Sequence, residues 1–185
     1  HRYHEIPSRP TCTDSLETAI TKVGHMLTQE VVTRLRTSRP KGFLLSGGID
    51  SCMVAAIANR YELSIGNEPI RTFSIGFPGS VDLIYAKQAA DYIGSKHTEV
   101  MVTHEDALAA IPIVVINNES YDQTTTRASA LMWLLLRWIS ENTDIVAIFS
   151  GEGADEMFCG YLYFHYAPCG TDLFEESRRL TIELP

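Results

Sequence analysis

The sequence lacks long apolar runs and an excess of basic residues. Its longest unbroken apolar stretch extends only from Ala130 to Leu136, far short of the roughly 18 residues that a membrane-spanning helix needs. Lys and Arg total 15 against 23 Asp and Glu, which gives a net charge of −8. A chain whose main task is to coat nucleic acid carries the opposite charge. We therefore expect a soluble protein that binds neither a membrane nor a nucleic acid.

Paired cysteines and an export signal are also missing. The first residues are polar, and no apolar segment of the signal-peptide type follows them. The four cysteines show no CxxC spacing, which argues against a zinc site, a sulfur-transfer site and a dense disulfide framework. We expect free thiols in a cytoplasmic protein, at Cys12, Cys52, Cys159 and Cys169.

What the sequence does contain is an alternation of short apolar segments with longer segments of helical periodicity. Residues 1–13 are interpreted as a linker or the end of a preceding domain, and residues 14–185 as one domain. The 45% apolar content of the whole sequence is enough for a sizeable core. Strands that are apolar on both faces and alternate with helices predict an α/β fold, a doubly wound parallel sheet sandwiched by helices. The expected strands are 42–45, 70–75, 97–102 and 144–149; the expected helices are 14–38 with a capping box at Asp14–Glu17, 50–61, 82–93, one from 103 onward, and 127–140, with a long polar loop at 117–126.

The first glycine-rich segment lies between an expected strand and an expected helix, where ligands bind in open α/β sheets. Two glycines let the backbone approach a phosphate, and the helix amino terminus offers unpaired N–H groups. A carboxylate at such an anion site indicates a divalent ion, because Mg²⁺ is usually held by a carboxylate and phosphate oxygens. The alternative is a tight turn in which Asp50 caps the helix. The segment is Ser46-Gly47-Gly48-Ile49-Asp50-Ser51.

A second glycine-rich segment, with three acids, follows another expected strand. The carboxyl ends of parallel strands meet at one edge of a sheet, so both segments should open there. Three acids so close together repel one another, and a metal ion or an amine reactant would relieve the repulsion. A solvated turn with Asp155 capping a short helix is the alternative. The segment is Ser150-Gly151-Glu152-Gly153-Ala154-Asp155-Glu156.

The SGGxDS pattern resembles the phosphate-binding loop of the N-type ATP pyrophosphatases. Together with the second segment, with 121–129 (YDQTTTRAS) and with 160–165 (GYLYFH), the chain resembles the synthetase domain of glutamine-hydrolysing asparagine synthetases from about Leu16 to about Arg178. The resemblance implies an adenine nucleotide alpha hydrolase-like fold and an AMP-forming carbon–nitrogen ligase. In that reaction ATP and aspartate form β-aspartyl-AMP and pyrophosphate, and ammonia then displaces AMP to give asparagine.

The resemblance also implies roles for individual residues. Glu152 matches the catalytic acid that handles the acyl adenylate and ammonia, where a base is sensible because the attacking ammonia must lose a proton. Thr124 and Arg127 match positions near the acyl substrate; Arg127 would pair with the α-carboxylate of aspartate, unless it is a surface charge at a helix start. Asp50 and Asp155 would hold Mg²⁺. ATP would contact Leu44, Ser46, Gly47, Gly48, Asp50, Ser51, Ile75, Ser150 and Gly151.

The chain also departs from the family pattern. Cys52 and Ala154 stand where Ser is usual, and Cys159 where Gly or another small residue is common; we expect these changes to tune the site. The glutaminase domain of the family and a later phosphate-contacting lysine do not occur in the 185 residues. We therefore expect a domain that is incomplete at its carboxyl end and receives ammonia from a glutaminase domain or subunit. Two other readings stay open: β-lactam synthetase-like ring closure, and a nucleotide-binding module without catalysis.

Overall fold

The computed structural model describes residues 12–183, which divide into two units. The larger unit comprises residues 29–151, and the smaller unit comprises residues 12–28 together with 152–183. Helix α1 (Leu16–Arg34) begins in the smaller unit and ends in the larger one. The predicted linker at 1–13 falls almost wholly outside the described residues.

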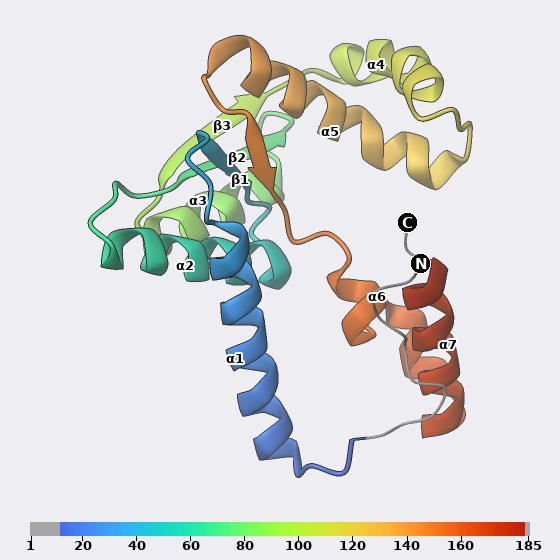
Figure 1. Ribbon diagram of the computed structural model, residues 1–185. Coiled ribbons are helices and arrows are strands. Elements are labelled where there is room, and N and C mark those ends of the chain that lie inside the picture. Colours follow the sequence, from blue (N-terminus) through green and yellow to red (C-terminus); the bar gives the residue numbers. More distant parts are fainter. Residues whose placement is uncertain (1–11, 184–185) are drawn as a thin grey trace. The chain divides into compact units, whose positions relative to one another are not determined.

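The larger unit is built on a parallel sheet of β1 (Lys41–Leu44), β2 (Arg71–Gly76), β3 (Lys96–Met101) and β4 (Ala147–Phe149) (Figure 1). The strand order is β3-β2-β1-β4, with Leu44 opposite Phe73 and Phe43 opposite Phe149. The chain therefore adds β2 and β3 on one side of β1 and returns to place β4 on the other. This reversal puts the topological switch point, where open α/β sheets bind ligands, at the carboxyl ends of β1 and β4.

Helices cover both faces of this sheet. In Figure 1, α2 (Ile49–Ser64) and α3 (Val81–Ile93) lie against one face, and α5 (Gln123–Asn142) lies against the other and pairs with α4 (His104–Asn117). The predicted doubly wound parallel α/β sandwich is therefore confirmed. Its main core forms between the α5 side chains and one face of the strands, around Phe73, Val100, Leu135, Ile139 and Ile145.

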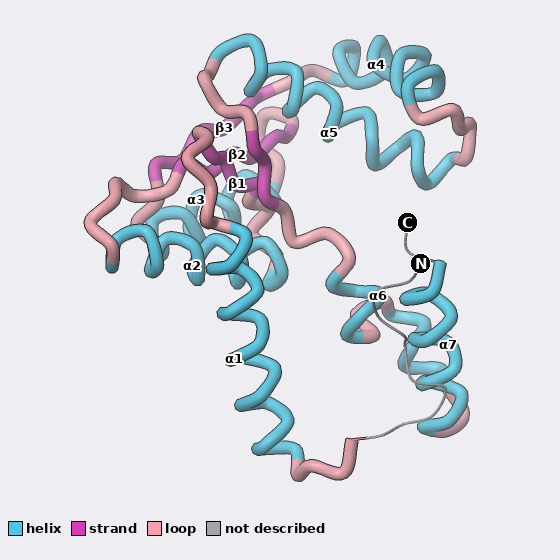
Figure 2. Tube along the Cα trace, viewed as in Figure 1, coloured by secondary structure: helices cyan, strands magenta, loops and turns pink. Residues whose placement is uncertain are grey.

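The smaller unit contains no strand among its described residues. It carries the first turns of α1, then α6 (Ala154–Phe158), the 3₁₀ helix η1 (Leu162–Tyr166) and α7 (Gly170–Glu183) (Figure 2). Helix α6 packs against α7, and Phe164 of η1 is buried with 4% of its surface exposed. This unit therefore depends on short elements that support one another.

Several predicted boundaries were wrong for local reasons. The predicted Asp14–Glu17 capping box does not form: the Ser15 hydroxyl accepts from the Thr18 N–H (3.3 Å), and Asp14 instead pairs with Lys22 at 2.7 Å. The strand predicted at 144–149 is reduced to β4, 147–149. The long loop predicted at 117–126 shortens to 118–122, because Asp122 caps α5 by accepting from the Thr125 N–H at 2.8 Å.

Other predicted boundaries hold. Gly94 ends α3 in the left-handed conformation at φ 76°, as a helix-terminating glycine should. Thr103 opens α4 with a complete capping box to Asp106. All four cysteines are free thiols, and no helix in residues 12–183 combines the length and apolarity needed to cross a membrane.

Candidate functional site

The glycine loop, residues 46–51, connects β1 to α2 and is held by its own hydroxyl groups. The Ser46 and Ser51 hydroxyls lie 3.0 Å apart, and Ser51 Oγ also accepts from the Ser46 N–H at 3.2 Å and donates to the Gly48 carbonyl at 3.1 Å. The Gly48 N–H donates to Ser46 Oγ at 3.3 Å. These bonds join the end of β1 to the first turn of α2, so the loop has a defined shape before any ligand arrives.

The amino terminus of α2 is open to an anion. Its N-cap is Gly48, which offers no side-chain cap, and Asp50 is the second residue of the helix. The alternative in which Asp50 caps the helix is therefore wrong. Within the described residues the half-buried Asp50 carboxylate makes no hydrogen bond or ion pair. A carboxylate and hydroxyl groups beside an uncapped helix terminus fit Mg²⁺ with a phosphate.

Two glycines of the predicted site are required by close backbone packing. Gly47 has φ 84°, and a Cβ there would lie 2.7 Å from the Ala86 nitrogen of α3. A Cβ on Gly151 would lie 2.7 Å from both the Asp50 carbonyl carbon and the Ser51 nitrogen. The chain leaving β4 therefore touches the first turn of α2, which brings Ser150 and Gly151 to the glycine loop.

Leu44 and Ile75 complete the part of the predicted nucleotide site that the larger unit brings together. Leu44 is the last residue of β1, and Ile75 lies near the end of the neighbouring strand β2. Both are half-buried and pack against the edge of the main core. They provide an apolar surface at the same end of the sheet as the hydroxyl-lined loop. An apolar surface suits a nucleotide base, and a polar loop beside it suits the attached phosphates.

Thr124 and Arg127 lie in the first two turns of α5, in the larger unit, rather than in a loop. Both side chains are exposed, and Arg127 makes no ion pair among the described residues. Between them, the buried hydroxyl oxygen of Thr126 has no hydrogen-bond partner in the described chain. Arg127 is thus an exposed cation near the start of α5 that makes no ion pair with the described residues. Its role in binding the aspartate carboxylate stays a prediction.

The acid turn, residues 152–156, belongs to the smaller unit. Gly153 is the N-cap of α6 at φ 89°, so the alternative in which Asp155 caps this helix is wrong. Glu152 is exposed, whereas Asp155 and Glu156 are half-buried. Because Asp50 and Asp155 belong to different units, their shared metal ion remains a prediction. Within residues 12–183 no three His, Cys, Asp or Glu side chains are gathered as in a preformed metal site.

Tyr161 contacts the acid turn, although the motif alone did not single it out. Its hydroxyl donates a short hydrogen bond to the Glu156 carboxylate. That hydrogen bond, with some burial and the neighbouring carboxylates, raises the pKa of Tyr161 to about 12. The phenol therefore remains a donor at neutral pH. The sequence does place Tyr161 five residues after Glu156, but this spacing brings the two side chains together only if the chain reverses direction between them.

The chain reverses because of the two residues that follow α6. Cys159 adopts the left-handed conformation at φ 56°, and this conformation explains why Gly is common at its position. Gly160 follows, where a Cβ would lie 1.9 Å from Asp155 Oδ1. The departure at Cys52 is sterically mild; burial raises the pKa of its thiol, and a hydrogen bond with Ser51 lowers it by less.

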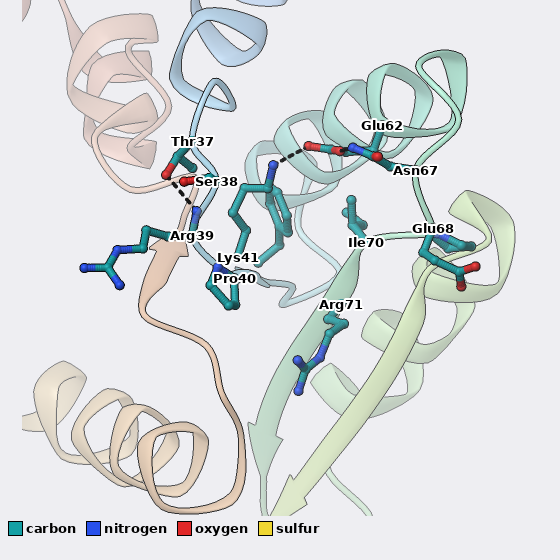
Figure 3. A pocket seen from close by; sticks show the side chains of 12 residues that line it. Thr37, Ser38, Arg39, Pro40, Lys41, Glu62, Asn67, Glu68, Ile70 and Arg71 are labelled. Atoms are coloured by element: carbon teal, nitrogen blue, oxygen red, sulfur yellow. Dashed lines mark hydrogen bonds and ion pairs between the residues drawn. The ribbon is translucent and has the colours of Figure 1, made fainter.

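A cavity of about 450 Å³ lies at the opposite edge of the sheet, at the amino ends of β1 and β2. Figure 3 shows Lys41 reaching toward Glu62, at 2.6 Å, with Asn67 beside the same carboxylate. Burial opposes ionisation of Glu62, but the bonds from Lys41 and Asn67 hold its pKa below the usual value. None of the predicted site residues lines this cavity. The buried pair instead links the far ends of β1 and α2, the two elements that flank the glycine loop.

Comparison with known proteins agrees with this arrangement. The sequence profile of the asparagine synthase family matches residues 22–183. The chain belongs to that family. It is 45% identical over 170 residues to the glutamine-hydrolysing asparagine synthetase of Cricetulus griseus, covering 91% of this chain and 30% of that protein. The corresponding protein of Gallus gallus is 41% identical over 194 residues, covering 100% of this chain and 34% of the relative.

The asparagine synthase family assignment therefore covers most of the chain, although the chain spans only about a third of the length of these relatives. Among solved structures, the U34-tRNA thiolase NcsA from Methanococcus maripaludis superposes with a TM-score of 0.53 at 13% identity, covering 91% of this chain and 67% of that chain. At that identity the likeness concerns the fold alone. It agrees with the adenine nucleotide alpha hydrolase-like architecture predicted from the sequence.

Proposed function

We propose that this chain carries the ATP-dependent synthetase chemistry of asparagine formation. Aspartate attacks the α-phosphorus of ATP through its side-chain carboxylate, giving β-aspartyl-AMP and pyrophosphate. Ammonia then attacks the acyl carbon, loses a proton and displaces AMP, which leaves asparagine. The main support is the glycine loop at the switch point of the sheet, with Gly151 packed on the first turn of α2.

The nucleotide would lie along the carboxyl edge of the sheet. Leu44, Ile75 and the Gly151 backbone would contact adenine and ribose, while the N–H groups of α2 and the Ser46 and Ser51 hydroxyls would bind pyrophosphate. Asp50 and Asp155 would hold Mg²⁺, which supplies positive charge to the phosphate oxygens when bound. The chain's contribution is orientation, because the loop is already shaped by its own hydrogen bonds.

The acyl substrate would lie beside the α-phosphate. The Arg127 guanidinium, without an ion pair in the described chain, would bind the α-carboxylate of aspartate, and Thr124 would donate from the same helix start. Glu152, which follows Gly151 directly and is exposed, would accept the proton that ammonia loses.

Ammonia would come from glutamine through a glutaminase domain or subunit, since the relatives are glutamine-hydrolysing asparagine synthetases. A cytoplasmic location fits the four free thiols, which persist in a reducing compartment.

The test is to incubate the purified chain with Mg²⁺ and ATP, with and without aspartate, using ammonium as the nitrogen donor. We expect AMP and pyrophosphate only when aspartate is present, and asparagine only when ammonium is added. The ring-closing alternative would be favoured if no asparagine formed and if an amino-acid derivative, supplied in place of aspartate, gave AMP and a cyclised product. Bound ATP with no AMP would favour a module without catalysis.

A matched pair of variants assigns the activity to the glycine loop. Asp50→Asn removes the carboxylate at the second position of α2, whereas Asp82→Asn makes the same change at the second position of α3, where the side chain is exposed. We expect Asp50→Asn to reduce AMP formation by about 100-fold or more, because it would weaken the hold on the metal ion that stabilises charge on the phosphates, and such stabilisation is typically worth this much. Asp82→Asn should keep normal activity. Equal effects of the two changes would contradict the assignment.

A further inference from the structure

Two aromatic rings meet at the carboxyl edge of the sheet, beside the apolar part of the proposed nucleotide site. The ring of Phe77 stacks on the imidazole of His104, with centroids 4.1 Å apart and planes 4° apart. Phe77 is the first residue after β2, and His104 is the first residue of α4. Both belong to the larger unit, as do β1 and the glycine loop.

The two rings continue rows of side chains on the face of the sheet that α5 covers. Ile75 lies two residues before Phe77 and packs against the main core. Val102 lies two residues before His104 and packs against the same core. Because side chains two residues apart share one face of an extended chain, the ring pair extends this face beyond the strand ends. It therefore lies in line with Ile75, which belongs to the apolar part of the proposed nucleotide site.

The backbone holds both rings in place. The Val102 N–H donates to the Gly76 carbonyl at 3.1 Å, which joins the chain segments that leave β3 and β2. The capping box between Thr103 and Asp106 then fixes the first turn of α4, which carries His104. The ring pair is thus set between two fixed chain segments.

The hydrogen-bonding groups of this imidazole are not used within the described chain. His104 is exposed, Phe77 is half-buried, and the ring nitrogens of His104 make no hydrogen bond with residues 12–183. In contrast, His97 of β3 uses both ring nitrogens, for Thr72 and Ser74. A neutral imidazole offers one donor and one acceptor. His104 therefore presents both, on a ring whose direction is set by stacking.

We propose that Phe77 and His104 form a base-binding wall of the nucleotide site, in which Phe77 orients the imidazole and a ring nitrogen of His104 hydrogen-bonds the edge of adenine. The proposal rests on the proposed function, since the base is that of the same ATP molecule. Leu44 and Ile75 would contact the face of the base, and His104 would meet its edge at the outer end of the same apolar row. The edge of adenine carries both donor and acceptor groups, so either imidazole tautomer finds a partner.

Three variants test this wall. His104→Ala removes the imidazole from an exposed position. Phe77→Leu keeps an apolar side chain but removes the stacking ring, so the imidazole nitrogens remain while their orientation is lost. His25→Ala is the matched control, because His25 is also exposed on a helix but belongs to the smaller unit.

The measurement is calorimetric binding of two ligands to the 185-residue chain with Mg²⁺ present and aspartate absent. One ligand is ATP, and the other is inorganic triphosphate, which is the phosphate chain of ATP without its nucleoside. We expect His104→Ala to weaken ATP binding about tenfold, as the loss of one hydrogen bond can, and to leave triphosphate binding unchanged. Phe77→Leu should weaken ATP binding about threefold, the effect of losing an aromatic stack, again without changing triphosphate binding. His25→Ala should bind both ligands as the unaltered chain does.

Three results would overturn the proposal. His104→Ala could bind ATP as tightly as the unaltered chain, or it could lose the same factor for triphosphate, which would make His104 a support of the glycine loop and not a contact of the base. An equal loss in His25→Ala would also overturn it. Thermal unfolding shows whether Phe77→Leu is folded; if it is not, His104→Ala alone decides. Failure of the unaltered chain to bind ATP is a different outcome: it overturns the proposed function, and the base-binding wall with it.

Discussion

The glycine loop and the acid turn both follow a parallel strand and both combine glycine with carboxylates, yet they are held by different forces. The glycine loop is fixed by hydroxyl–backbone bonds within one β1–α2 unit and by the packing of Gly151. The acid turn sits on a five-residue helix fastened by one phenol and a ring stack. The proposed phosphate site thus lies on a rigid sheet edge, whereas the acids are positioned by contacts that the loss of one hydroxyl oxygen would weaken.

The largest effect is expected from removing the half-buried cation of the Lys41–Glu62 pair, which joins the far ends of β1 and α2. Lys41→Ala removes the cation from Glu62, whose side chain is only 5% exposed and whose carboxylate then keeps only its hydrogen bond from Asn67. We expect the free energy of unfolding to fall by about 3–5 kcal/mol, the usual cost of breaking a buried ion pair. Urea denaturation measures it. Lys96→Ala, which removes an exposed pair with Glu68, should cost less than about 1 kcal/mol; similar losses for both would contradict the anchoring role.

The next largest effect concerns the contact between Gly151, which follows β4, and the first turn of α2. Gly151→Ala places a methyl group 2.7 Å from the backbone of Asp50 and Ser51, so the two segments must separate. We expect a loss of about 1–3 kcal/mol in stability, as for other overpacked sites, together with weaker ATP binding measured by calorimetry. Gly170→Ala is the control, because a Cβ there meets nothing within 4 Å. Unchanged ATP affinity in Gly151→Ala would separate this contact from the nucleotide site.

A smaller effect is expected at the chain reversal after the acid turn. Cys159→Gly replaces a left-handed non-glycine residue with the residue that adopts φ 56° without strain. We expect a gain of about 0.5–1 kcal/mol, reduced by the greater freedom of glycine in the unfolded chain. Thermal unfolding followed by circular dichroism should show a higher midpoint. A lower midpoint would mean that the thiol makes a contact worth more than the backbone strain.

The smallest expected effect is a pH dependence of the sheet. His97 bonds Thr72 at 2.9 Å and Ser74 at 3.1 Å, and burial lowers its pKa, with smaller opposing effects from Glu99 and Asp91 and a reinforcing one from Lys87. The folded chain therefore binds this proton less readily than the unfolded chain, so the stabilising contribution is complete above the ordinary histidine pKa and is lost as the pH falls below it. Denaturation at pH 7.5 and 5.5 measures the difference, which His97→Gln should reduce; an unchanged difference would exclude His97 as its source.

Sequence patterns identified the strands and the two loops because both depend on local chemistry. Apolar strands between glycine turns predicted the sheet, and its parallel order followed from the alternation with helices. The ends of helices and strands were harder to predict. Residues 123–126 look like a polar loop, but they form the first turn of α5 once Asp122 caps it. The start of the predicted fourth strand is taken up by Asp144, which forms an ion pair with Arg71 instead of extending β4.

The site was predictable where backbone geometry dictates residue type and less so where side chains meet across a turn. Gly47 and Gly151 are glycines because other residues would clash or be strained, so the pattern carries their role. The Tyr161–Glu156 hydrogen bond depends on the left-handed conformation of Cys159, which the sequence does not indicate because cysteine rarely adopts it. Likewise, the pairing of Lys41 with Glu62 joins residues 21 apart, and nothing in their local sequence marks it.

The most direct test of the central claim is to map where ATP binds by following backbone amide NMR signals of the 185-residue chain during titration with Mg²⁺ and ATP. The account predicts that the largest shifts occur at residues 46–51 and 150–151, and that Asp50→Asn abolishes them while Asp82→Asn does not. Shifts confined to residues 37–43 and 67–71, around the cavity at the opposite edge of the sheet, or no shifts at all, would contradict it.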